Sequence, residues 1–178
     1  MAIIVCPLSR APEIARESKP SHVVSLLDPG AAFPIIESCA GERHFRLDVH
    51  DINTEVDGLD AVCARRIGRL LDFVSGWSRE APILIHCYAG ISRSTATAFI
   101  TACAHNPAQD EEEIARALRA ASPTATPNRR FVALADAALG RNGRMNSAVE
   151  AIGPGSPRWP DIDEAQPFSI VSRFGARA

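Results

Sequence analysis

The sequence predicts an α/β sandwich, in which helices cover both faces of a mainly parallel central sheet. Short apolar runs alternate along the chain with amphipathic, helix-like segments. One apolar run, residues 83–85, leads through a short polar loop into an alanine-rich helical run, and sheets of this class bind ligands at such strand ends. With 178 residues, of which 46% are hydrophobic and 22% charged, the chain is long enough for one domain with a full core.

Four strands are expected in the first half of the chain. Two of the runs are apolar almost throughout, which is typical of strands covered on both faces, and a third alternates polar and apolar residues. Pro7 ends the first run, and Asp28-Pro29-Gly30 is a turn signal after the second. His22 opens the second strand and is interpreted as structural. The predicted strands are residues 2–6, 22–27, 43–49 and 83–85.

Five helices are expected from apolar residues that recur every three or four positions. Ser9, Asp110 and Thr126 stand where N-caps are favoured. The acidic run at residues 111–113 indicates helix-end electrostatics in preference to a metal site. The predicted helices are residues 9–17, 59–77, 95–104, 111–121 and 127–139.

The chain is expected to divide at residue 140. Residues 1–140 are predicted to form a single catalytic domain. Residues 141–178 contain four prolines and four glycines and no long periodic run, so they are expected to be a C-terminal tail that is loosely packed or partly disordered.

Composition restricts the classes of partner and location. The net charge of −2 and the isoelectric point of 6.2 give no electrostatic reason to expect nucleic acid or an anionic membrane as a partner. No apolar run reaches the ~20 residues of a membrane helix, and the first residues are too short for a signal peptide. Five scattered cysteines without a CxxC pair favour a reducing cytoplasm, and Cys6, Cys39, Cys63 and Cys103 are interpreted as core residues.

The most informative stretch is the loop at residues 86–94, with the sequence His-Cys-Tyr-Ala-Gly-Ile-Ser-Arg-Ser. A loop wrapped around a helix N-terminus turns several backbone N–H groups toward one point, where they and the helix dipole form an anion site. Arg93 adds a planar fork for two oxygens of a phosphate. Cys87 lies at the mouth of this cradle, where a thiolate is favoured. The stretch therefore predicts a nucleophile aimed at a bound oxyanion.

These residues resemble the HCxxGxxR[ST] signature of the cysteine-dependent protein tyrosine phosphatases, and most closely the dual-specificity-like branch. The match is complete at His86, Cys87, Gly90, Arg93 and Ser94. A weaker resemblance extends from about residue 22 to residue 139. The high alanine content is typical of a bacterial member. The resemblance implies a three-layer sandwich with the phosphotyrosine-phosphatase fold and a reaction that requires no metal and no cofactor.

The resemblance implies a role for each residue of the loop. The Cys87 thiolate attacks phosphorus and forms a phosphocysteine intermediate, and Ser94 assists the departure of the sulfur. Gly90 is expected to adopt a backbone geometry that a Cβ would forbid. His86 is expected to support the thiolate. The expected substrate-binding residues are His86, Tyr88, Ala89, Gly90, Ile91, Ser92 and Arg93.

The family also uses an aspartate from a separate loop as general acid. Three aspartates precede Cys87 at comparable distances in the sequence, namely Asp48, Asp51 and Asp57. The spacing favours Asp57, whereas the position directly after a strand favours Asp51. We select Asp51 and keep the other two as alternatives.

The expected substrate is a phosphorylated protein or a small phosphoester, with phosphotyrosine preferred and phosphoserine or phosphothreonine also open. The loop interior lacks lysine, which disfavours phosphoinositides, although a phosphoinositide phosphatase stays an alternative. A catalytically silent phosphate-binding module is a second alternative, and sulfur transfer or arsenate reduction at the same cysteine is a third.

Overall fold

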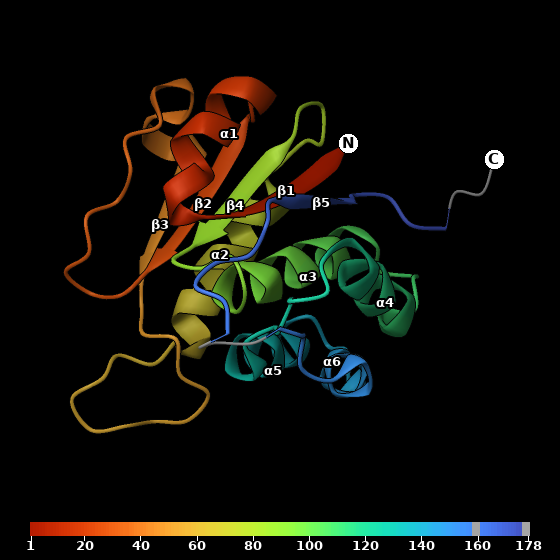
Figure 1. Cartoon of the computed structure of the whole chain (residues 1–178). Helices are drawn as coiled ribbons and strands as arrows, with labels where there is room; N and C mark the ends of the chain where they lie inside the picture. The colour runs from red at the N-terminus through yellow and green to blue at the C-terminus, as the bar shows by residue number, and fades with distance from the viewer. Residues whose placement is uncertain (158–160, 176–178) are drawn as a thin grey trace.

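The computed structural model describes residues 1–157 and 161–175 and contains a five-stranded sheet packed between helices (Figure 1). The strand order is β3-β2-β4-β1-β5, in which the first four strands are parallel and β5 runs antiparallel to β1. The mainly parallel sheet is therefore confirmed. The strands are β1 (Ala2–Pro7), β2 (His22–Leu27), β3 (His44–Asp48), β4 (Ile83–Cys87) and β5 (Phe168–Val171).

Helices cover both faces of the sheet, which confirms the predicted sandwich. On one face, α1 packs with the short 3-10 turn at Glu37–Cys39 over Cys6, Val23 and Leu84. The other five helices lie on the opposite face, and their apolar side chains share one core with β1, β2 and β4. The helices are α1 (Ala11–Ser18), α2 (Ala64–Ser75), α3 (Arg93–His105), α4 (Glu111–Ala121), α5 (Arg129–Ala138) and α6 (Arg144–Ile152).

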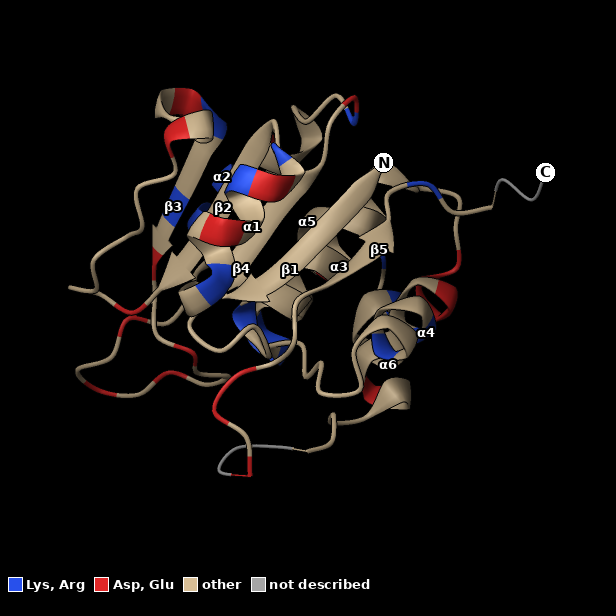
Figure 2. Ribbon diagram, turned by 45° about the horizontal axis from the view of Figure 1, so that its top comes forward, with Lys and Arg blue, Asp and Glu red and all other residues tan. Residues whose placement is uncertain are grey.

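The centre of the molecule is apolar. β1 and β4 carry no Lys, Arg, Asp or Glu and are drawn entirely in tan in Figure 2. α3 packs against both strands, and each residue from Arg93 to Cys103 is buried. β4 ends at Cys87 and α3 begins at Arg93, so the loop between them is anchored at both ends by elements packed in the core. Within the described residues, no helix combines the length and the apolar character needed to span a bilayer.

Four predicted helix starts differ from the structure, and one of them is that of α3, which begins at Arg93 and not at residue 95. The helix expected at residues 59–77 begins only at Ala64, because the apolar spacing of five residues between Val62 and Ile67 breaks the helical period. Leu59 lies instead in an exposed turn.

The other two helix starts were assigned to the wrong capping residue. Asn128, and not Thr126, caps α5 by accepting hydrogen bonds from the N–H groups of Arg130 and Phe131. Ser9 lies inside a 3-10 turn before α1 and makes no capping bond. The cap expected at Asp110 is confirmed by its bond from the N–H of Glu112.

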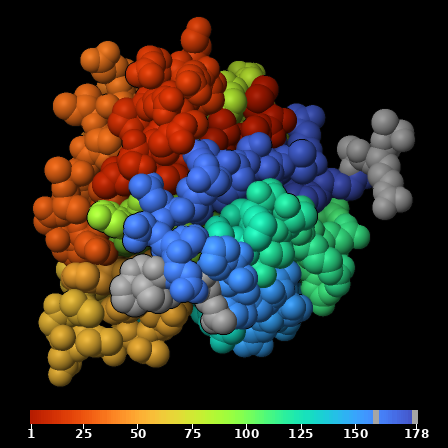
Figure 3. Space-filling model, in the orientation of Figure 1, coloured from red at the N-terminus to blue at the C-terminus, as the bar shows by residue number. Residues whose placement is uncertain are grey.

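The segment after residue 140 is not the loosely packed tail that was expected. α6 buries Met145, Ala148 and Val149 against α4 and α5, and β5 extends the sheet beside β1. Figure 3 shows this segment (blue) crossing one face of the molecule beside the N-terminal residues (red). The parts of the expected tail at residues 158–160 and 176–178 lie outside the described residues.

The acidic run at the start of α4 is a structural ion-pair site. Glu111 is buried and binds Arg141 at 2.8 Å and Arg144 at 3.1 Å. Arg141 also donates to the carbonyl of Cys103, which ties the C-terminal segment to α3. Among the described residues, no group of three or more His, Cys, Asp or Glu side chains is arranged to hold a metal ion.

Candidate active site

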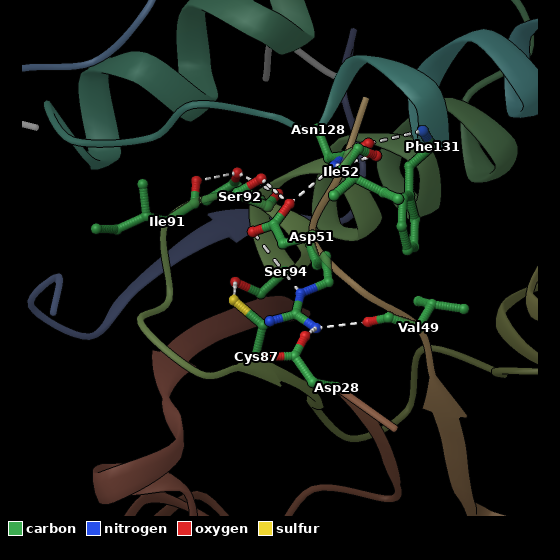
Figure 4. A network of polar contacts seen from close by, with 12 residues as sticks. Asp28, Val49, Asp51, Ile52, Cys87, Ile91, Ser92, Ser94, Asn128 and Phe131 are labelled. Carbon is green, nitrogen blue, oxygen red and sulfur yellow. Dashed lines mark hydrogen bonds and ion pairs between the residues drawn. The ribbon is translucent and has the colours of Figure 1, made fainter. Parts of the chain in front are cut away.

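The predicted site residues lie at one edge of the sheet, where the carboxyl ends of β2, β3 and β4 meet. Asp28 follows β2, Asp51 follows β3 and Cys87 ends β4. Figure 4 shows Asp28, Asp51 and Cys87 converging on one region, with Ser94 beside the sulfur. A parallel sheet collects these residues from distant parts of the sequence because its carboxyl ends share an edge.

Hydrogen bonds from other segments orient the peptide groups of the cysteine loop, residues 87–93. Four of its carbonyl oxygens accept these bonds and therefore point outward. Because the C=O and the following N–H of a trans peptide point in opposite directions, we infer that the N–H groups of residues 89, 90, 92 and 93 face inward. The four bonds are Leu8 N–H to Tyr88 O (3.0 Å), Ala165 N–H to Ala89 O (2.8 Å), Thr126 N–H to Ile91 O (2.9 Å) and Asn128 N–H to Ser92 O (3.3 Å).

Gly90 allows this loop to approach the end of β1. Its φ of +74° is in the left-handed region, and a Cβ added there would lie 2.9 Å from the backbone nitrogen of Pro7 and 3.0 Å from the backbone carbon of Cys6. Real Cβ atoms do not approach backbone so closely. The expectation that Gly90 has a geometry closed to other residues is therefore confirmed.

Cys87 lies beneath the loop with only 2% of its surface exposed. Its Sγ is 3.1 Å from Ser94 Oγ, in the first turn of α3. The N-terminus of this helix provides partial positive charge and free N–H groups next to the sulfur. The pair is arranged so that the hydroxyl can donate to a thiolate.

Arg93 extends from the first turn of α3 into the same region, and its side chain is only 4% exposed. Nη1 donates to Asp28 Oδ1 and to the carbonyl of Val49, both at 2.6 Å. Nε is buried, and no group of the described residues accepts a hydrogen bond from it. The guanidinium is thus fixed from one side and keeps a donor for an additional anion.

Asp51 is the only one of the three candidate aspartates that contacts Arg93 in the described part of the chain. Its Oδ1 accepts hydrogen bonds from Ser92 Oγ at 2.7 Å and from Asn128 Nδ2 at 2.8 Å. Its Oδ2 lies 3.7 Å from Arg93 Nε. Both neutral donors act on Oδ1, so Oδ2 accepts no side-chain hydrogen bond among the described residues. Asp48 ends β3 with an exposed side chain, and Asp57 lies in an exposed turn.

The other predicted loop residues have different environments. His86 is fully buried, and burial lowers its pKa to about 4, so its ring is neutral at pH 7. Tyr88 is 70% exposed. Ala89 and Ile91 are half-buried. Ser92, expected among the substrate-binding residues, directs its hydroxyl to Asp51.

The remaining cysteines are not all core residues. Cys6, Cys39 and Cys103 are buried, as expected, and burial raises the pKa of Cys6 and of Cys103 to about 12. Cys63 is exposed at the N-terminus of α2, and bonding to the backbone N–H of Arg66 lowers its pKa. The expectation that Cys63 is a core residue is wrong, because the helix starts there and not at residue 59.

Two side chains of the site, those of Asp28 and Asn128, are not among the residues predicted from the sequence. Asp28 was interpreted only as part of a turn. It directly follows β2, just as Asp51 follows β3 by three residues. Asn128 was recognised only as part of a helix start. Both residues could have been predicted from the sequence, because polar residues at strand ends and helix N-termini meet at the same edge of such a sheet.

No family model matches the chain, and no curated protein matches its sequence. Solved structures do match its fold. The human tyrosine phosphatase-like serine/threonine/tyrosine-interacting protein has a TM-score of 0.60 and 18% identity, over 78% of this chain and 91% of that one. PTP-2 phosphatase of Cydia pomonella gives 0.57 and 22%, over 75% and 83%. Human DUSP28 gives 0.58 and 15%, over 78% and 91%. The chain therefore has the fold of the dual-specificity and tyrosine phosphatases.

Proposed function

We propose that the protein is a cysteine-dependent phosphomonoester hydrolase that acts on phosphotyrosine through a phosphocysteine intermediate. The observation that carries the proposal is the convergence of Cys87, Arg93 and Asp51 on the inward-facing amides of the cysteine loop. A nucleophile, an anion clamp and a candidate acid are thereby present together. A silent phosphate-binding module would need the anion clamp but neither the nucleophile nor the acid.

In the first step, the sulfur of Cys87 attacks phosphorus, so that a P–S bond forms and the P–O bond to the leaving group breaks. The N–H groups of residues 89, 90, 92 and 93 hold the equatorial oxygens, and Arg93 Nε supplies a further donor. Asp51 Oδ2 gives its proton to the leaving oxygen.

In the second step, water attacks the phosphocysteine, and Asp51 takes a proton from this water. The P–S bond breaks, and the sulfur leaves as a thiolate. Ser94 Oγ, at 3.1 Å, donates to the departing sulfur and stabilises its negative charge. Every step uses groups of this chain and requires no metal or cofactor.

Two features of the cysteine loop support the expected substrate class. Tyr88 is the aromatic residue that flanks Cys87, and its exposed ring could pack on the ring of a phosphotyrosine. The loop interior offers no lysine for the additional phosphates of a phosphoinositide. We therefore expect phosphotyrosine proteins, and aryl phosphates as small substrates, with phosphoserine and phosphothreonine as slower substrates.

The proposal is tested by hydrolysis of an aryl phosphate in EDTA. Wild type should turn over, Cys87→Ser should be inactive, and Asp51→Ala should be slowed about 10²-fold or more. Asp57→Ala is the matched control, since Asp57 lies in the same loop with its side chain exposed, and its activity should equal that of wild type.

Three other outcomes would change or refute the proposal. If Asp57→Ala is slow and Asp51→Ala normal, the acid is Asp57. If wild type binds phosphate but hydrolyses no phosphoester, the protein is a binding module. If phosphoinositides are hydrolysed faster than phosphotyrosine peptides, the proposed substrate class is wrong.

A further inference from the structure

A chain of buried polar side chains crosses three strands behind the cysteine loop. Ser25 Oγ on β2 lies 2.5 Å from Nε2 of His86 on β4 and 2.7 Å from Nε2 of His44 on β3. Ser25 and His86 are register partners in the sheet. All three side chains are buried, and the chain ends at Arg46, whose Nη2 is 3.1 Å from His44 Nδ1. The exposed edge strand is thereby connected to the residue before Cys87.

The chemistry of Arg46 fixes the direction of every hydrogen bond in this chain. A guanidinium only donates, so His44 Nδ1 must accept. A neutral His44 then carries its proton on Nε2 and donates it to Ser25 Oγ. The Ser25 hydroxyl has one proton, and among the described residues its oxygen bonds only His44 and His86, so this proton goes to His86 Nε2. A neutral His86 must therefore carry its proton on Nδ1.

Both rings are neutral at pH 7, as this assignment requires. Burial, together with the positive charge of Arg46, lowers the pKa of His44 to about 4. Burial also lowers the pKa of His86 to about 4, and His44 acts in the same direction. A neutral imidazole has one N–H and one acceptor nitrogen, so its hydrogen-bond partners decide which nitrogen carries the proton.

Nδ1 is the ring nitrogen of His86 that does not bond Ser25, and His86 is the residue directly before Cys87. Nδ1 is buried, and no group of the described residues meets hydrogen-bond geometry with it. Burial lowers the pKa of His86, and the backbone of Cys87 opposes this shift by favouring the protonated ring. An N–H directed there attracts the strand-end carbonyl of Cys87, whereas a bare nitrogen lone pair would repel it.

We propose that Arg46, His44 and Ser25 are positioning residues that hold His86 in its Nδ1–H tautomer and so fix the backbone at Cys87. The consequence for catalysis rests on the proposed function, but the tautomer itself does not. The three residues act through His86 and touch neither the sulfur nor the anion site.

The direction of the chain can be reversed at one exposed position. In Arg46→Glu, a carboxylate accepts from His44 Nδ1–H, so His44 Nε2 accepts from Ser25. Ser25 Oγ must then accept from His86, which moves the His86 proton to Nε2. Arg46→Lys is the matched control, because an ammonium also only donates and preserves the original direction.

The readout is the pair of ring ¹⁵N shifts of His86 in histidine-labelled protein at pH 7. The chain has five histidines, and the signals of His86 and His44 are identified by replacing each of these two residues in turn. Wild type and Arg46→Lys should show His86 with Nδ1 protonated, and Arg46→Glu should show Nε2 protonated. Wild type with Nε2 protonated, or a His86 that does not change in folded Arg46→Glu, would overturn the proposal.

A second variant keeps the test decisive if Arg46→Glu does not fold. Ser25→Ala removes the link, so His86 should lose its uniform tautomer while His44, still facing Arg46, keeps its own. A His86 spectrum identical to wild type in Ser25→Ala refutes the relay. Loss of kcat/KM for an aryl phosphate in Arg46→Glu, with Arg46→Lys unchanged, is expected in addition. Equal kcat/KM in both refutes the catalytic consequence and leaves the proposed function intact.

Discussion

Asp28 Oδ1 and Arg93 Nη1 are 2.6 Å apart, and this contact joins residues 65 positions apart in the sequence. Arg93 is almost fully buried, so its guanidinium depends on fixed acceptors for its orientation. Asp28 and the Val49 carbonyl share one nitrogen and leave Nε directed toward Asp51. The turn after β2 is therefore part of the candidate site.

Replacement of Asp28 should reduce catalysis without abolishing it. Asp28→Ala removes a charge-assisted hydrogen bond of about 1.5–3 kcal/mol, which corresponds to a loss of kcat/KM of about 10- to 160-fold. Asp28→Asn retains an acceptor oxygen and should lose less. The measurement is kcat/KM for an aryl phosphate together with the inhibition constant of inorganic phosphate. Asp48→Ala, at the exposed end of the neighbouring strand, serves as control, and an equal loss there would contradict the assignment.

Asn128 has two separable roles. Its side-chain oxygen caps α5, and its amide nitrogen donates to Asp51. Asn128→Ala should therefore lose about 1 kcal/mol of unfolding free energy and also lose activity. Asn128→Asp should keep the cap, since Asp and Asn are equally good caps, but it places a carboxylate against Asp51.

The pair of Asn128 variants is measured by urea unfolding and by kcat. Asn128→Asp keeps the cap, but kcat should fall about tenfold or more, because Asp51 loses a donor and faces a like charge, and the same repulsion should lower the unfolding free energy. If Asn128→Asp is as active as wild type, Asp51 does not depend on this contact.

Replacement by alanine should change the unfolding free energy in opposite directions at Gly90 and Gly68. At Gly90, the positive φ costs about 1–2 kcal/mol for a side chain, and the Cβ would also meet the backbone of Cys6 and Pro7. Gly68 lies inside α2, and a Cβ there meets nothing within 4 Å. Gly68→Ala should thus raise the unfolding free energy by about 0.5–1 kcal/mol, whereas Gly90→Ala should lower it and eliminate activity. A stable, active Gly90→Ala would refute the loop geometry.

Acid should destabilise the fold between about pH 6.5 and pH 4. The pKa of His44 and of His86 is about 4 in the folded protein and 6.5 when solvated. The unfolded chain therefore binds more protons in this range, and the unfolding free energy falls as the pH falls. The difference corresponds to at most about 3 kcal/mol per ring.

The test of this pH dependence is urea unfolding at pH 7, 5.5 and 4. His44→Gln should flatten the fall in stability, whatever its effect at pH 7, because one of the two buried rings no longer takes up a proton. A stability that is constant from pH 7 to pH 4 in wild type would show that these rings are not buried neutral.

The sequence predicted the centre of the site because that part is local. Cys87, Gly90 and Arg93 lie within one loop, and their spacing alone defines the cradle. Asp51 was selected among three aspartates from its place directly after a strand, and the structure places it beside Arg93. Its role as general acid stays a prediction.

The parts that were missed depend on contacts between distant segments. Asn128 and Asp51 are 77 residues apart, and no periodicity connects them. Ala165 supports the loop through its backbone N–H, which leaves no trace in residue type. β5 has only four residues, too few for a strand pattern to be recognised. For α6, by contrast, the spacing of Met145, Ala148, Val149 and Ile152 was a helical signal, and the nearby prolines and glycines obscured it.

The most direct test of the central claim is detection of phosphocysteine on Cys87. Ser94→Ala should slow hydrolysis of the intermediate, which should then accumulate. The variant is mixed with an aryl phosphate, the reaction is quenched, and the masses of its peptides are measured by mass spectrometry. We predict that the Cys87 peptide gains one phosphoryl group while the peptide with exposed Cys63 stays unmodified. An enzyme that turns over substrate with no phosphoryl group on Cys87 would contradict the account.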